Sequence, residues 1–197
     1  MKNVIIILLV VASLFSCNKK EVKVPRVAMQ GDEKVADHSI IWMFYDEDKG
    51  IDVNEKNRIS STNWFFNVDK KITLDKLFPK VLKLIDKHNK KSPHNTKPMK
   101  NYFTYVNSLN DQLSFYQIDS INYKIIKKEA LPKFQGDTIL VNVGVSDLQI
   151  PTTEKNTIIQ AVYDSQMNFQ KYMEAKALFS KEIKIENLST TEYIITH

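Results

Sequence analysis

The chain has 197 residues, of which 43% are hydrophobic and 10% aromatic, and this composition excludes a disordered, low-complexity or collagen-like protein. Lysine and arginine total 28 against 23 aspartates and glutamates, a mild and evenly spread excess that does not argue for nucleic-acid binding. The single cysteine cannot form an internal disulfide, so stability has to come from the core.

The first segment of the chain has the layout of an export signal. Lys2 gives a cationic start, an apolar run follows from Val4 to Ala12, and the small Ser16 precedes Cys17. This run is much shorter than the roughly 20 apolar residues that a membrane-spanning helix needs. We therefore predict a signal peptide over residues 1–16.

The residues Leu14, Phe15, Ser16 and Cys17 resemble the lipobox of bacterial lipoproteins, whose signal peptide is cut before a cysteine that carries lipid. The resemblance implies that Cys17 is acylated, with chains such as palmitate, and is not available for catalysis. It also implies a place in the bacterial cell envelope, anchored to a membrane, with the periplasmic or surface side of the outer membrane as the expected location. Two or more acyl chains hold durably, because each buried methylene contributes about 0.8 kcal/mol.

Two alternatives to this interpretation treat Cys17 as incidental: an ordinary secretory signal and an uncleaved anchor. The anchor is disfavoured because the lysines after the apolar run oppose its orientation.

Residues 18–37 mix charges with Pro25 and Gly31 and lack sustained periodicity, which predicts a flexible tether. With the lipidated cysteine, the tether covers residues 17–37 and would span roughly 25 Å as a coil. Residues 38–197 then form the folded part. We expect one α+β domain with a largely antiparallel sheet and two main helices, over about 74–90 and 153–180.

The first strand is predicted over residues 39–46, where both faces are apolar, as in a strand buried on both sides. Residues 46–50 follow as a turn, with Gly50 free to adopt positive φ. The acids around this turn lack the spacing of an EF-hand loop, so a solvated turn is favoured over a cation site.

A second strand at 63–69 leads into the helix at 74–90, which has an apolar and a lysine-rich face. Pro79 requires that the helix begin at Asp75 or kink. Residues 68–85, VDKKITLDKLFPKVLKLI, resemble the strand-turn-helix of the periplasmic domain in proton-driven biopolymer-transport proteins. The lysines of the polar face are Lys76, Lys80, Lys83 and Lys87.

The stretch 88–100 contains two prolines and no acid, which predicts a loop. Its histidines, His88 and His94, have no carboxylate or thiol beside them to complete a metal site, so we predict none. Its lysines are a candidate patch for lipid headgroups or a polyanionic polymer, with a plain solvated loop as the alternative. The patch consists of Lys87, Lys90, Lys91, Lys97 and Lys100.

The second half of the chain has three predicted elements. Residues 113–128 fit one long bent strand or a hairpin, residues 137–147 fit a further strand, and residues 153–180 show helical spacing. A faint similarity links residues 64–77 with 140–156, as strand, Asp, short turn, Thr and helix; it indicates either an internal repeat or the common way in which β-to-α connections are built. Residues 181–197 carry both strand and capping-box patterns, so the sequence does not decide between a strand and a helix there.

No catalytic motif stands out: the chain has no G-x-S-x-G, no phosphate-binding glycine loop and no H-E-x-x-H. We therefore expect a non-catalytic binding or structural domain without cofactor. Its expected partners are the membrane, through acylated Cys17, and an envelope protein or anionic polymer, but not nucleic acid. The alternative is a lipid-anchored hydrolase of an envelope polymer, since paired carboxylates need not be close in sequence.

Overall fold

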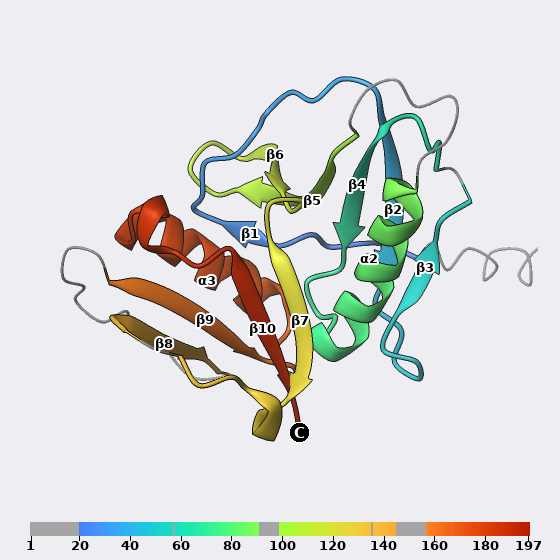
Figure 1. Cartoon of the computed structure of the whole chain (residues 1–197). Coiled ribbons are helices and arrows are strands. Elements are labelled where there is room, and N and C mark those ends of the chain that lie inside the picture. Colours follow the sequence, from blue (N-terminus) through green and yellow to red (C-terminus); the bar gives the residue numbers. More distant parts are fainter. Residues whose placement is uncertain (1–19, 57, 91–98, 135, 145–156) are drawn as a thin grey trace, which may run out of the picture.

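Two β-sheets enclose two helices in the computed structural model of the protein, which describes residues 20–56, 58–90, 99–134, 136–144 and 157–197 (Figure 1). The larger sheet has six strands in the order β1-β5-β4-β2-β3, with β6 also pairing with β5. Its strands are β1 (Arg26–Val27), β2 (His38–Phe44), β3 (Asp52–Asn54), β4 (Asn63–Val68), β5 (Asn101–Asn107) and β6 (Gln112–Gln117).

The smaller sheet has four strands in the order β7-β10-β9-β8. They are β7 (Asn122–Lys127), β8 (Thr138–Val143), β9 (Ile158–Asp164) and β10 (Thr191–Thr196). The helices are α2 (Leu74–Asn89) and α3 (Phe169–Glu182), with short 3-10 turns η1 (Lys128–Ala130) and η2 (Ile185–Asn187).

Strand direction differs from the prediction, although the single α+β domain with two main helices is confirmed. Among the described strands only β2–β3 and β5–β6 pair in antiparallel fashion, and the other pairs are parallel. The predicted largely antiparallel sheet is therefore wrong. The physical reason is that α2 and α3 are crossover connections, which return the chain in the same direction.

Helix α2 confirms the predicted segment and extends from Leu74 to Asn89 with Pro79 inside it. Its N-cap is Thr73, in an extended conformation. The apolar face is buried, including Leu77 and Phe78. Strands β2 and β4 also form where predicted, but β2 buries one face, and the opposite face with Trp42 is only half-buried.

The second predicted helix is wrong over its first half. Residues 158–164 form strand β9, and α3 begins only at Phe169, with Asn168 as the N-cap that accepts a hydrogen bond from the Lys171 N–H at 3.0 Å. Residues 153–156 lie outside the described residues. Strand β9 is apolar on both faces, and such a run fits helical spacing as well as strand spacing.

Residues 113–128 form neither one bent strand nor a hairpin. Strand β6 pairs with β5 in the larger sheet, whereas β7 pairs with β10 in the smaller sheet. The chain therefore passes from one sheet to the other near Asp119. Strand β8 confirms the strand predicted over 137–147 as far as the described residues extend, and β10 shows that the open C-terminal segment ends as a strand.

The fold contains two copies of one structural unit. Strands β2, β4 and β5 with α2 have the same order, direction and crossover as β8, β9 and β10 with α3. The two helix starts meet through reciprocal hydrogen bonds: the Leu74 N–H donates to the Met167 carbonyl at 3.0 Å, and the Phe169 N–H donates to the Ile72 carbonyl at 2.8 Å. This exchange is the pattern expected around a local two-fold axis.

The strand-to-helix turns of both units are built alike. The carboxylate of Asp69 accepts the Lys71 N–H at 2.9 Å, and that of Asp164 accepts the Gln166 N–H at 2.8 Å. An internal repeat is therefore present, but it pairs β4–α2 with β9–α3; residues 145–156 of the predicted second copy lie outside the described residues.

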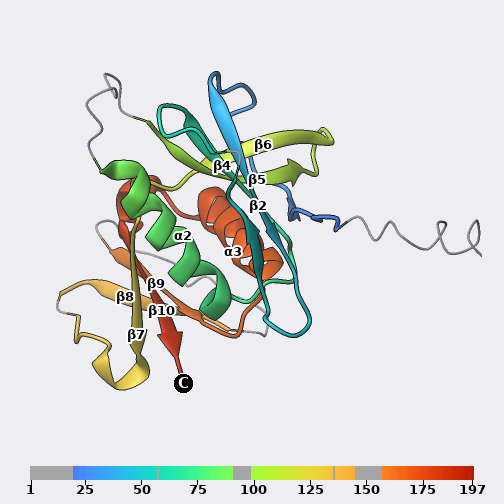
Figure 2. The same ribbon diagram turned by 90° about the vertical axis from the view of Figure 1, so that its right-hand side faces the viewer.

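One apolar core joins both units, because each helix contacts both sheets (Figure 2). Phe78 of α2 packs against Phe103 of β5 and against Tyr123 of β7. Tyr172 of α3 packs against Phe103 and against Tyr163 of β9. The two helices also meet directly through Phe78 and Tyr172, so neither unit has a core of its own.

The N-terminal segment is part of the fold, which corrects the predicted tether over 17–37. Strand β1 lies beside β5, where the Val106 N–H donates to the Pro25 carbonyl at 2.8 Å. Val27 and Met29 are buried, with 4% and 3% of their surface exposed. A Cβ atom on Gly31 would lie 2.3 Å from the Tyr105 hydroxyl, so only glycine fits there. The folded part begins near residue 20.

Replacing Met29 with alanine should lower the free energy of unfolding by about 2–5 kcal/mol, because the substitution leaves a cavity in the core. Urea denaturation measures this change. The matched control is Lys34→Ala in the same segment, an exposed position where a change within about 0.5 kcal/mol is expected. If both variants were equally stable, the segment would be a tether after all.

Candidate functional site

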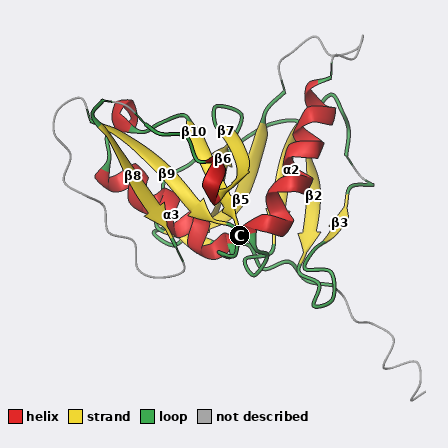
Figure 3. Cartoon of the chain, turned by 60° about the horizontal axis from the view of Figure 1, so that its bottom comes forward, coloured by secondary structure: helices red, strands yellow, loops and turns green. Residues whose placement is uncertain are grey.

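A groove of about 310 Å³ lies between strand β3 and helix α2, which are neighbours in the fold (Figure 3). One wall is the strand with the residues just before and after it, and the other wall is the exposed side of the helix. The groove is lined by Ile51, Asp52, Val53, Glu55, Lys80, Lys83, Leu84 and Lys87.

Helix periodicity places the lysines on one wall. Lys80, Lys83 and Lys87 are three and four residues apart, so their side chains lie above one another on the same side of α2. Leu84 closes the groove floor and is 4% exposed. Lys87 lies in the last turn of the helix, where a cation interacts favourably with the helix dipole.

The acids of the strand wall are already compensated. Asp52 pairs with Lys20, and Glu55 pairs with Arg58 and, at 3.6 Å, with Lys87. Lys80 and Lys83 are both exposed and have no ion-pair partner within the described part of the chain. The groove therefore carries two uncompensated positive charges.

The predicted patch is only partly assembled in the described structure. Lys87 lines the groove, Lys90 follows the end of α2, and Lys100 precedes β5, where its N–H donates to the Asn63 side chain at 2.9 Å. Lys91, Lys97 and Cys17 lie outside the described residues.

Sequence reasoning missed Lys80 and Lys83 as site residues, although it placed them on the polar face of α2. Their spacing relative to Lys87 was the available signal.

His88 has a structural role. Its ring stacks on Trp64 with centroids 3.9 Å apart, and its Nε2 lies 3.0 Å from the Thr62 carbonyl. Its Nδ1 lies 2.8 Å from Oδ1 of Asn101, whose amide donates to Asp119 at 2.6 Å and thereby fixes Oδ1 as an acceptor. Both ring nitrogens thus lie against oxygen atoms of the protein, and the ring is held in the core by these contacts and by Trp64.

The acidic turn after β2 is ordered by its own backbone. Hydrogen bonds from the N–H groups of Lys49, at 2.8 Å, and Asp48, at 3.1 Å, lower the pKa of the Asp46 carboxyl. Gly50 adopts φ +74°, as predicted for this turn. Across the described ranges, no group of three or more His, Cys, Asp or Glu side chains gathers as metal ligands do.

A second cavity, of about 230 Å³, lies at the carboxyl ends of the parallel strands of the smaller sheet, where ligands often bind in α/β sheets. His197 and Asp164 meet there at 3.2 Å. Among its described lining residues there is no serine, threonine or cysteine. Tyr163 contributes to the wall, but its ring packs against Tyr172 in the core.

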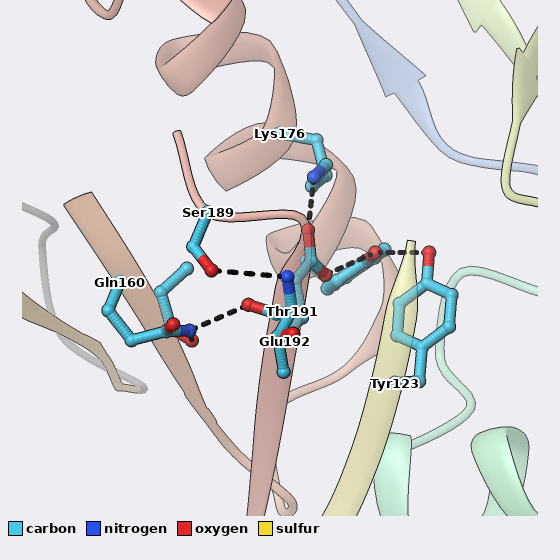
Figure 4. Close-up of polar contacts among 8 residues, drawn as sticks. Tyr123, Gln160, Lys176, Ser189, Thr191 and Glu192 are labelled. Atoms are coloured by element: carbon cyan, nitrogen blue, oxygen red, sulfur yellow. Dashed lines mark hydrogen bonds and ion pairs between the residues drawn. The ribbon is translucent and has the colours of Figure 1, made fainter. Parts of the chain in front are cut away.

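A polar cluster is enclosed in the core, where Lys176 of α3 and Glu192 of β10 form an ion pair with both side chains 3% exposed (Figure 4). The Tyr172 hydroxyl donates to Glu192 at 3.0 Å and lies 3.2 Å from the Tyr123 hydroxyl. Burial lowers the pKa of the Lys176 ammonium, but the interactions with Glu192 and Tyr116 together outweigh it and raise the pKa above its ordinary value. The closed environment points to a structural role.

Burial, followed by the charge of Glu192, raises the pKa of Tyr172 and Tyr123 well above the ordinary value. Both hydroxyls therefore stay protonated at neutral pH and are not nucleophiles.

Comparison of the chain with protein-family models, with curated proteins and with solved structures gives no match. In the described part of the chain, neither helix combines the length and the apolar character that crossing a membrane requires.

Proposed function

We propose that the protein is a lipid-anchored component of the bacterial cell envelope whose α+β domain binds an anionic partner without catalysis. The anchor is Cys17, by the resemblance of Leu14 to Cys17 to a lipobox. The observation that carries the binding role is the groove beside α2, in which Lys80 and Lys83 lack ion-pair partners among the described residues.

The physical chemistry of the groove favours a negatively charged ligand. A cleft with an excess of positive charge attracts counter-charged groups, and this attraction weakens as salt screens it. Since Asp52 and Glu55 are paired with other cations, they do not cancel the charges of Lys80 and Lys83. The groove also has an apolar floor, at Leu84, against which the ligand's non-polar part can pack.

A lipid-anchored hydrolase of an envelope polymer is the second candidate, and the contact between His197 and Asp164 beside the second cavity supports it. A carboxylate can orient a histidine as a general base. The candidate is weaker because the described lining offers no serine, threonine or cysteine nucleophile for that base to activate.

Replacing Lys80 and Lys83 with glutamine should lower the salt concentration at which the protein leaves an immobilised polyanion. Each lysine near an anionic surface contributes about 1 kcal/mol, so the double variant should bind at least tenfold more weakly at low salt, by order of magnitude. The melting temperature should be nearly unchanged, because both side chains are exposed.

The matched control removes two lysines near the end of α3, Lys181→Gln with Lys184→Gln, and should elute close to the wild type. If the groove variant and the wild type eluted equally at low salt, the groove would not be the anionic binding site. The proposed lipid anchor at Cys17 would be unaffected by that result.

A further inference from the structure

The chain enters the domain beside the groove. Lys20, the first described residue, forms an ion pair with Asp52 of the strand wall. Two further contacts fix the path that follows: the Lys23 N–H donates to the Asp69 carboxylate at 3.0 Å, and the Lys70 N–H donates to the Lys23 carbonyl at 2.8 Å. The entry point is therefore held against β3.

The distance from this entry point to the lipid attachment site is short. Cys17 precedes Lys20 by three residues, and three residues of extended chain span at most about 11 Å. Since an acylated cysteine lies at the membrane surface, this short connection limits how far the strand wall of the groove, which Lys20 contacts at Asp52, can lie from the headgroups.

We infer that the anionic partner of the groove is the headgroup layer of the same membrane that carries the anchor. This inference rests on the proposed function. Lys80 and Lys83 then supply a second membrane signal beside the acyl chains, the combination by which many lipidated proteins fix their contact with a membrane. The domain lies with α2 and β3 toward the anionic lipids.

A soluble anionic polymer explains the groove less well. A binding site for such a ligand could lie anywhere on the exposed surface. This groove, however, lies where the tethered end of the chain enters the fold. With Lys20 held at Asp52 and β1 inside the domain, two residues and not twenty separate Cys17 from the first described contact with the domain.

The test uses the acylated, full-length mature protein in vesicles of phosphatidylcholine, with and without about a third of phosphatidylglycerol. A water-soluble amine-acetylating reagent labels accessible lysines, and mass spectrometry reads each site. Lys80 and Lys83 should react several-fold more slowly in the anionic vesicles, about fivefold for 1 kcal/mol per lysine. The protection should disappear at 1 M salt, where the Debye length is about 3 Å.

Lys181, in the last turn of α3, and Lys184, just after this helix, serve as internal controls and should react equally in both vesicles. Helix α3 lies on the other side of the molecule from α2 and β3 (Figure 1). Flotation of the vesicles reports the anchor separately. If the protein floats but Lys80 and Lys83 react equally in both vesicles, the headgroup inference is wrong while the anchor stands. Protection by added soluble polyphosphate, but not by phosphatidylglycerol, would assign the groove to a polymer instead. If the protein does not float, the proposed function and the inference fail together.

Discussion

Replacing Lys176 with methionine should lower the free energy of unfolding by about 3–5 kcal/mol. The substitution removes the positive charge but leaves the Glu192 carboxylate buried, with both side chains only 3% exposed in the native protein. An uncompensated charge in the core costs far more than the lost contact itself. Denaturation by guanidinium chloride measures the change.

Lys181→Met is the matched control for this substitution. Lys181 lies on the same helix and pairs with Glu182 at 3.2 Å, but its side chain is 77% exposed. Exposed pairs contribute about 0–1 kcal/mol, so the control should change stability little. Adding Glu192→Leu to Lys176→Met should restore most of the loss, because no charge then remains buried. A loss below about 1 kcal/mol for Lys176→Met would mean that water reaches the pair.

The buried pair bears on how the two repeated units stay together. Lys176 and Glu192 belong to the second unit, but the Lys176 ammonium also lies 5.3 Å from the ring centroid of Tyr116 on β6, in the larger sheet. The cluster thus spans the boundary between the sheets. A destabilised pair should therefore weaken the whole domain, since both units share one core.

Local patterns in the sequence predicted the elements whose periodicity is unambiguous. Helix α2 repeats apolar residues at three and four positions and is bounded by Thr73 and a lysine-rich end, so it could be placed within one residue. The stretch from Ile158 to Glu182 was harder. Its strand and its helix are separated only by the turn around Ser165 and Gln166, and both are apolar enough to fit one continuous helix.

Strand direction and the repeat depend on contacts far apart in the chain. The copy of the Asp69 turn is the Asp164 turn, 95 positions later, and the preceding strands share few residue types. Both turns have an apolar residue before the cap, Ile72 and Met167, which is the signal that would have aligned them correctly. The N-terminal segment also contained a signal of extended structure, because Pro25, Val27 and Met29 occupy alternate positions of the sequence. In the structure these residues are buried, and the residues between them are exposed.

The candidate site was predictable in type but only partly in detail. The excess of lysines around α2 is visible in the sequence, and one of the lysines of the predicted patch, Lys87, lines the groove. The free charges of Lys80 and Lys83 were not predictable, because they depend on which lysines the strand wall neutralises. That pairing joins residues as distant as Lys20 and Asp52, and no local pattern encodes it.

Replacing Cys17 with alanine should abolish incorporation of labelled fatty acid completely, because Cys17 is the only cysteine in the chain. The precursor should accumulate uncut, since cleavage in lipoproteins occurs before the lipid-bearing cysteine. The stability of the domain should be unaffected, as the described fold begins at Lys20 and contains no disulfide. Metabolic labelling and gel mobility measure the two effects, with Ser13→Ala as the control that should be labelled and processed like the wild type.

The most direct measurement is the mass of the N-terminal peptide of the mature protein purified from its own membranes. We expect a peptide that begins at Cys17 and carries two or three acyl chains. A mature chain that begins at any other residue, or an unmodified Cys17, would contradict the membrane anchor and with it the placement of the α2 groove at a lipid surface.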